Sequence, residues 1–240
     1  MAPAVSRHLI PGAAMRFLTQ PATDLTYSDV FLVPSKSDIT SRLDVDLSSG
    51  DGTGTTIPLV VANMTAVSGK RMAETVARRG GMAILPQDIP LDVLRDVTAW
   101  VKTRDTLFES PVVLTGADTV IDAMHLMNKR AHNAVVVVGA ADSAFVGVVR
   151  AADCDGVDRF ASLASVLHAN VLTIDAAPFD AIRAAADAGE LSPGAAKAKS
   201  DSALRAAFDV LDKAGTDFAP VLRSGAVVGC LLYTSDAADE

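Results

Sequence analysis

The sequence is poor in the residues that build several kinds of functional site. Of its 240 residues, two are Cys, four are His and one is Trp, and aromatic residues make up 5%. Two cysteines cannot form a disulfide framework, and the four histidines have no Cys, His or Asp partner at metal-ligand spacing. We therefore expect neither structural disulfides nor a metal site.

Concentrated positive charge and long apolar runs are also missing. Lys and Arg number 21 against 29 Asp and Glu, which gives a formal net charge of −8. Because nucleic-acid binding needs clustered basic residues, no nucleic-acid partner is expected. No apolar stretch approaches the roughly 18 residues of a membrane span, and the N-terminus lacks the apolar run of a signal peptide. We expect no membrane partner and a cytoplasmic location.

Half of the residues are hydrophobic, which is typical of a globular protein with one large or two small domains. Apolar periods alternate over the first hundred residues. They predict a buried parallel strand over 57–62, a helix over 68–79, a short strand over 82–85 and a second helix from Pro90 onward. This alternation indicates a parallel α/β fold.

Beyond Asp105 one pattern occurs twice. The strand pattern at 135–138 returns 84 residues later at 219–222, and Val146-Gly147 corresponds to Val228-Gly229 after a hairpin shorter by two residues. The same 84-residue offset relates the apolar helix positions Val120, Ala123, Met124 and Met127 to Leu204, Ala207, Phe208 and Leu211. With leading strands at 112–114 and 171–174, the sequence predicts two copies of one small α/β unit.

The second copy is longer than the first between residues 176 and 200. We interpret this stretch as a surface insertion, because the later helix directly precedes its strand, as in the first copy. The alternative is that residues 179–188 form the repeat helix.

Several segments resemble the opening of the IMP dehydrogenase/GMP reductase family. They are Leu-Thr-Tyr-Ser-Asp-Val-Phe-Leu-Val-Pro at 25–34, Ile-Pro-Leu-Val-Val-Ala-Asn-Met at 57–64, Arg-Met-Ala at 71–73 and Gly80-Gly81. The resemblance implies a (β/α)8 TIM barrel, in many members carrying a pair of CBS domains after the second barrel helix. The implied fold class is therefore α/β, with the first βα units of a barrel over 15–104. Tandem CBS domains over 105–168 and 169–229 follow.

The strand end at Ala62-Asn63-Met64 resembles the GMP reductases. The dehydrogenases more often have Ser in place of Ala62 and Asp-Thr in place of Thr65-Ala66. The resemblance implies conversion of GMP to IMP and ammonia with NADPH, through a Cys thiolate that attacks C2 of the purine. The alternatives are IMP dehydrogenase, which oxidises IMP to XMP with NAD, and a CBS module that binds nucleotides without catalysis. The intact enzyme is expected to be a homo-oligomer.

Ala62, Asn63 and Met64 are the candidate substrate-binding residues. They follow a predicted strand directly, at the end where barrel enzymes build their sites. The resemblance implies that Met64 packs against the purine base of the nucleotide. From the residues alone, a core position is the favoured interpretation of Met64, and Asn63 is either a hydrogen-bonding residue of the pocket or a turn residue.

Arg150 and Asp153 are the candidate effector-binding residues. Residues 147–153 resemble the CBS signature Gly-apolar-apolar-Thr/Ser-x-x-Asp, in which the Asp accepts hydrogen bonds from the ribose of an adenine or guanine nucleotide. Arg150 replaces the hydroxyl residue and could pair with a phosphate. The alternative is that Asp153 caps a helix that begins near Ala151.

No catalytic residue is expected in this chain. Cys154 lies between Asp153 and Asp155, whose charges raise a thiol pKa and disfavour a nucleophilic role. A closed barrel needs about 250 residues, whereas residues 15–104 supply two βα units. In the family, the reactive Cys, most phosphate contacts and the NAD(P) surface follow the CBS pair. We expect the chain as written to be inactive.

Both ends of the sequence look foreign to this pattern. Residues 230–240 resemble the translation of a sequencing-library adapter, and residues 1–14 resemble an upstream mis-start. We expect neither segment to belong to the native protein.

Overall fold

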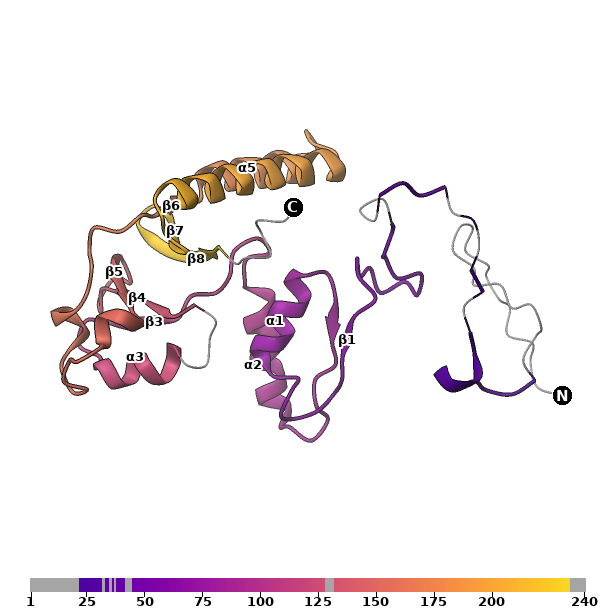
Figure 1. Cartoon of the computed structure of the whole chain (residues 1–240), viewed down its shortest axis with the longest axis horizontal. Helices are drawn as coiled ribbons and strands as arrows, with labels where there is room; N and C mark the ends of the chain where they lie inside the picture. Colours follow the sequence, from indigo (N-terminus) through magenta and orange to yellow (C-terminus); the bar gives the residue numbers. More distant parts are fainter. Residues whose placement is uncertain are drawn as a thin grey trace. The chain divides into compact units, whose positions relative to one another are not determined.

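The structure is a computed structural model that describes residues 22–31, 33, 34, 36, 38–41, 45–127 and 132–233. It divides into two compact units, Met1–Val101 and Lys102–Glu240, and each is described by itself (Figure 1). The expectations for residues 1–14 and for 234–240 lie outside the described residues. None of the helices that the structure describes is both long and apolar enough to cross a membrane.

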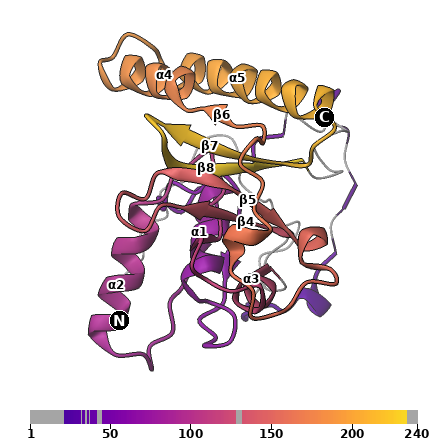
Figure 2. The same ribbon diagram turned by 90° about the vertical axis from the view of Figure 1, so that its left-hand side faces the viewer.

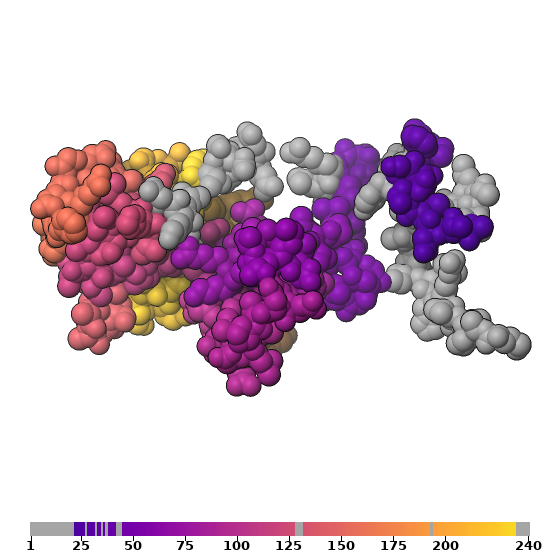
Figure 3. Space-filling model, turned by 90° about the horizontal axis from the view of Figure 1, so that it is seen from below, coloured from indigo at the N-terminus to yellow at the C-terminus, as the bar shows by residue number. Residues whose placement is uncertain are grey.

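The first unit has the predicted order of strand, helix, strand and helix. After a short 3-10 helix (Tyr27–Asp29), β1 (Val60–Val61) pairs in parallel with β2 (Met82–Ala83). Helix α1 (Lys70–Arg78) connects these strands, and α2 (Leu91–Lys102) follows β2. The Lys70 ammonium lies 5.3 Å from the Trp100 ring centroid, so the two helices are in contact, and their atoms form one packed lobe (Figure 3).

The prediction that the strand over 57–62 is buried on both faces is wrong for this chain. Leu59 and Val60 are 50% and 56% exposed. The sheet in this unit has two strands among the described residues, and burial on both faces of a parallel sheet requires further strands and helices. The apolar run therefore forms a strand without forming a core.

The second unit contains two three-stranded sheets of the same topology. The first joins β3 (Val113–Thr115), β4 (Ala134–Val138) and β5 (Phe145–Arg150). The second joins β6 (Ile174–Asp175), β7 (Phe218–Arg223) and β8 (Ala226–Leu232). In both, the first strand is parallel and the third antiparallel to the middle one, and the hairpin register shifts at Val137/Val138 and again at Val221/Leu222.

The middle strands carry apolar residues on both faces. Alternate residues of β4 contact α3 (Val120–Met127) on one face, where Val120, Ala123 and Met127 are buried. Its other residues join a core that also includes Phe218 and Cys230 of the second sheet. The two sheets therefore share one core, which makes the halves a single compact unit. Two short 3-10 helices, Ala151–Cys154 and Leu163–Ser165, follow β5.

Residues 176–200 are not a loose surface insertion. They form α4 (Ala177–Asp187) and the first turns of α5 (Pro193–Lys213), which lie side by side over the second sheet (Figure 2). Phe179 is 3% exposed and packs edge-on against Phe108, with ring centroids 4.9 Å apart. Because α4 buries this ring, it belongs to the core, and the helix predicted to match the repeat is the second half of α5.

The segment predicted to be foreign begins inside the second sheet. Cys230 and Leu231 are 0% and 3% exposed and pair with Pro220 and Ala219 of β7. Their apolar side chains fill core positions of β8, whatever their origin.

The outer strands β5 and β8 are each covered by a segment that leads into the other half of the unit. His168 precedes β6 but pairs with Val148 of β5, through two hydrogen bonds of 2.9 Å. Glu109 precedes β3 but pairs with Cys230 of β8, through hydrogen bonds of 3.0 and 2.8 Å. We call residues 107–109 and 167–168 the exchanged segments. They cover the edges that β5 and β8 would otherwise present to solvent.

Glycines occupy the equivalent positions beneath both exchanged segments. A Cβ at Gly147 would overlap Leu167 and lie 2.5 Å from the His168 carbonyl oxygen, and a Cβ at Gly229 would overlap Phe108. Glycine is required at Gly147 because a backbone carbonyl approaches too closely for a side chain, and at Gly229 because the Phe108 side chain occupies the space.

We expect Gly147→Ala to lower the free energy of unfolding by about 1–3 kcal/mol, the usual range for overpacking, because a backbone carbonyl must move. Gly194→Ala is the matched control: it lies in α5 with no atom near its Cβ position and should leave stability unchanged or slightly higher. Urea unfolding followed by circular dichroism measures both. Equal stability of the two variants would contradict the close approach.

Candidate functional sites

The candidate substrate residues lie at the carboxyl end of β1, as predicted. Ala62, Asn63 and Met64 are exposed and turn the chain toward α1, with the Met64 N–H donating to the Ala62 carbonyl at 2.8 Å. Met64 is 57% exposed, so it is not part of a core among the described residues.

Three further polar residues, Thr65, Ser68 and Asp88, lie near the same strand ends, and sequence reasoning did not single them out as site residues. The Thr65 hydroxyl donates to a carboxylate oxygen of Asp88 at 3.1 Å, which joins the loops after β1 and β2. Ser68 is buried and its hydroxyl donates to the Ile84 carbonyl at 2.6 Å. The sequence did carry a signal for them, since they follow two predicted parallel strands. The carboxyl ends of neighbouring parallel strands meet at one edge of the sheet.

Asp153 has protein partners for both carboxylate oxygens. One oxygen accepts the Arg150 N–H at 2.7 Å, which caps the 3-10 helix as the alternative interpretation anticipated. The other lies 3.0 Å from Nε2 of His168, in an exchanged segment. Asp153 therefore joins the end of β5 to the segment that covers this strand.

The Arg150 side chain turns in a different direction and connects the two halves. Its guanidinium donates to the Thr216 hydroxyl at 2.6 Å and lies 3.0 Å from a carboxylate oxygen of Asp217, just before β7. Arg150 also lines a cavity of about 370 Å³ together with His132, Asn133, Ala134, Ala151, Ala152 and Asp217.

Asp153 is not among the residues that line this cavity, so the side chains of the two predicted effector residues point to different places, although the Arg150 N–H donates to Asp153. His132 supplies a polar group that sequence reasoning missed. It is 5% exposed, with Nε2 3.5 Å from Glu109 and Nδ1 buried without a hydrogen-bond partner among the described residues. An unsatisfied buried nitrogen at a cavity wall favours a ligand or a water there.

Cys154 lacks the environment of a reactive thiol. Burial raises its pKa, and the charges of Asp153 and Asp155 raise it further. The predicted direction is confirmed, although burial is the larger cause. The described residues contain no group of three or more His, Cys, Asp or Glu side chains arranged to hold a metal ion.

Parallel strands that end in exposed loops, followed by a doubled α/β unit, define the class of this chain as a mixed α/β protein. The family described as IMP dehydrogenase / GMP reductase domain matches residues 24–229, and the chain belongs to this family.

GMP reductases are among the similar proteins. Those of Mycobacterium tuberculosis and Mycobacterium bovis are 52% identical over 164 residues, covering 68% of this chain and 34% of each relative. The IMP dehydrogenase of Bacillus subtilis is 34% identical over 154 residues, covering 62% of this chain and 30% of the relative. The chain thus spans about a third of the length of the relatives it matches.

Two solved structures of Trypanosoma brucei GMP reductase also match. The complex with guanosine 5'-monophosphate is 21% identical with a TM-score of 0.49, covering 88% of this chain and 42% of that one. The complex with guanosine 5'-triphosphate is 21% identical with a TM-score of 0.48, covering 88% and 47%.

Proposed function

We propose that this chain is part of a GMP reductase, an oxidoreductase that converts GMP to IMP and ammonia with NADPH. The observation that carries the proposal is the 52% identity to mycobacterial GMP reductases, against 34% to the B. subtilis IMP dehydrogenase. Ala62, where the dehydrogenases more often have Ser, supports the same branch. IMP dehydrogenase, with NAD, is the second candidate because the family includes both reactions.

In the intact enzyme, Ala62, Asn63 and Met64 would contact the purine nucleotide. Met64 offers an exposed apolar side chain at a strand end, which suits the face of a purine ring, and the Asn63 amide can both donate and accept hydrogen bonds. The Thr65–Asp88 hydrogen bond would hold this loop in position.

The same strand end does not fit a nicotinamide cofactor by itself. Its side chains are exposed on a two-stranded sheet, and a dinucleotide site requires a concave surface that buries most of the ligand. We propose that cofactor binding and the reactive Cys belong to parts of the enzyme other than this chain.

For the second unit we propose a tandem CBS pair that binds an adenine or guanine nucleotide. Support comes from its two halves of equal topology and from the cavity beside Arg150, whose guanidinium could donate hydrogen bonds to a phosphate in place of Asp217. A ribose at Asp153 would have to replace the contact with His168. This exchange is feasible because the His168 side chain is 60% exposed.

We expect the 240-residue chain to show neither GMP-dependent NADPH oxidation nor IMP-dependent NAD reduction, because the described strands form no closed barrel. A chimera in which residues 24–229 replace the matching part of the M. tuberculosis GMP reductase should oxidise NADPH with GMP. A chimera that folds but does not oxidise NADPH with GMP would count against the GMP reductase proposal. Turnover by the purified 240-residue chain would overturn the proposed inactivity.

The nucleotide proposal predicts a higher melting temperature of the full chain with ATP, GTP, AMP or GMP. At 100 times the dissociation constant, linkage stabilises the folded state by about 2.7 kcal/mol. Asp153→Asn should abolish most of this shift, while the stability without ligand stays within about 1 kcal/mol because an amide oxygen can still cap.

Two further variants complete this test. Asp155→Asn removes an exposed neighbouring charge and should leave the nucleotide shift intact. Arg150→Ala should weaken the binding of phosphate-bearing ligands only. A melting temperature indifferent to all four nucleotides at millimolar concentration would refute the effector site.

A further inference from the structure

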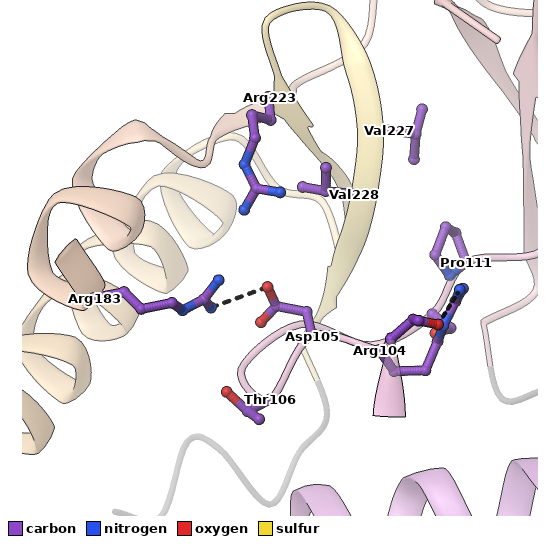
Figure 4. A pocket seen from close by; sticks show the side chains of 10 residues that line it. Arg104, Asp105, Thr106, Pro111, Arg183, Arg223, Val227 and Val228 are labelled. Carbon is purple, nitrogen blue, oxygen red and sulfur yellow. Dashed lines mark hydrogen bonds and ion pairs between the residues drawn. The ribbon is translucent and has the colours of Figure 1, made fainter. Parts of the chain in front are cut away.

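A second cavity lies in the Lys102–Glu240 unit, away from the Arg150 cavity, and we propose that it binds phosphate-bearing anions. Its volume is about 480 Å³. It is bounded by the segment that leads into the first half, by α4, and by the β7–β8 hairpin (Figure 4). None of its lining residues belongs to the proposed substrate or effector residues.

The charge of the cavity wall favours an anion. Three arginines, Arg104, Arg183 and Arg223, line it against one acidic residue, Asp105. The three arginines lie 79 and 40 positions apart in the sequence, and the folded chain brings them to the wall of one cavity although its net charge is −8. Hydroxyl groups of Thr103 and Thr106 add neutral hydrogen-bonding groups to the same wall.

The single carboxylate in the wall, that of Asp105, already has a hydrogen-bond partner and an ion-pair partner. Asp105 accepts the Leu107 N–H at 2.8 Å through one oxygen and pairs with Nη2 of Arg183 at 3.0 Å through the other. Its side chain is 9% exposed. Asp105 therefore fixes the leading segment and Arg183, and its carboxylate already has partners within the protein.

Arg223 is also held in a fixed orientation. Its Nε and Nη2 donate to the two oxygens of Asp180, both at 2.6 Å, which leaves Nη1 outside that pair. The hydrogen bonds from Arg223 lower the pKa of Asp180, so this carboxylate stays ionised at neutral pH. Because Arg183 and Arg223 are 41% and 43% exposed, both remain accessible to a ligand.

This arrangement suits a phosphate group better than a carboxylate. One guanidinium satisfies a carboxylate in a bidentate pair, whereas a phosphate presents three terminal oxygens and up to two charges to several guanidinium groups. Guanidinium groups already oriented by Asp105 and Asp180 lose little side-chain entropy on binding. The group could be free phosphate or part of a nucleotide, and the test distinguishes these sources.

The test is calorimetric titration of the full chain with inorganic phosphate, pyrophosphate, GMP and guanosine at low ionic strength. We expect saturable binding of pyrophosphate, and weakening of at least tenfold in Arg223→Gln and in Arg104→Gln, because each removes a charge-assisted contact. Arg205→Gln, an exposed arginine on α5, is the matched control and should bind as the wild type does.

Arg150→Ala separates this cavity from the proposed effector site and should keep pyrophosphate binding. In that variant, binding of GMP but not guanosine would identify a nucleotide phosphate as the occupant, and binding of phosphate and pyrophosphate without GMP would identify a free anion. The proposal is overturned if no phosphate species binds saturably, or if the Arg104→Gln/Arg223→Gln double variant binds with the wild-type constant. It is also overturned if Arg205→Gln weakens binding as much as the cavity variants do. The loss would then reflect the net charge of the chain and not a contact in the cavity.

Discussion

The backbone pairing of His168 with Val148 and of Glu109 with Cys230 holds the second unit together. Each pair closes the outer edge of one sheet with a segment that leads into the other half, so both sheets depend on the chain that connects the halves. The close approach explains the glycines at 147 and 229, and it places Asp153 beside His168. Both cavities of this unit depend on the same arrangement, because each is lined from the two halves.

The two units contribute differently to a family enzyme. The first supplies one strand end of a proposed nucleotide site, where Met64 is exposed and the Thr65–Asp88 contact orders the loops. The second supplies a closed core of its own and two cavities lined by arginine. We therefore propose substrate contacts for the Met1–Val101 unit, and anion or nucleotide binding for the Lys102–Glu240 unit.

Local periodicity predicted most elements, because the spacing of apolar residues is a property of each segment. The helices α1, α2 and α3 and the strands β4 and β7 follow it closely. It could not predict the exposure of Val60, which depends on how many strands join the sheet, or the burial of Phe179, which depends on Phe108. The exchanged segments and the Arg104, Arg183 and Arg223 cavity carry no periodic signal, because residues distant in sequence form them. The sequence predicted an effector role for Arg150 and Asp153 and offered a helix cap at Asp153 as the alternative. The hydrogen bond from the Arg150 N–H agrees with the alternative, and the direction of the Arg150 side chain required the structure.

Native-state hydrogen exchange tests the central claim, that the exchanged segments are integral to the core. Amides of Glu109, Val148, His168 and Cys230 form the reciprocal pairs. We expect them to open with the same free energy as the buried amides of β4, in one cooperative unit. Exchange of Glu109 and His168 at the rates of exposed loops, while β4 and β7 stay protected, would contradict the account.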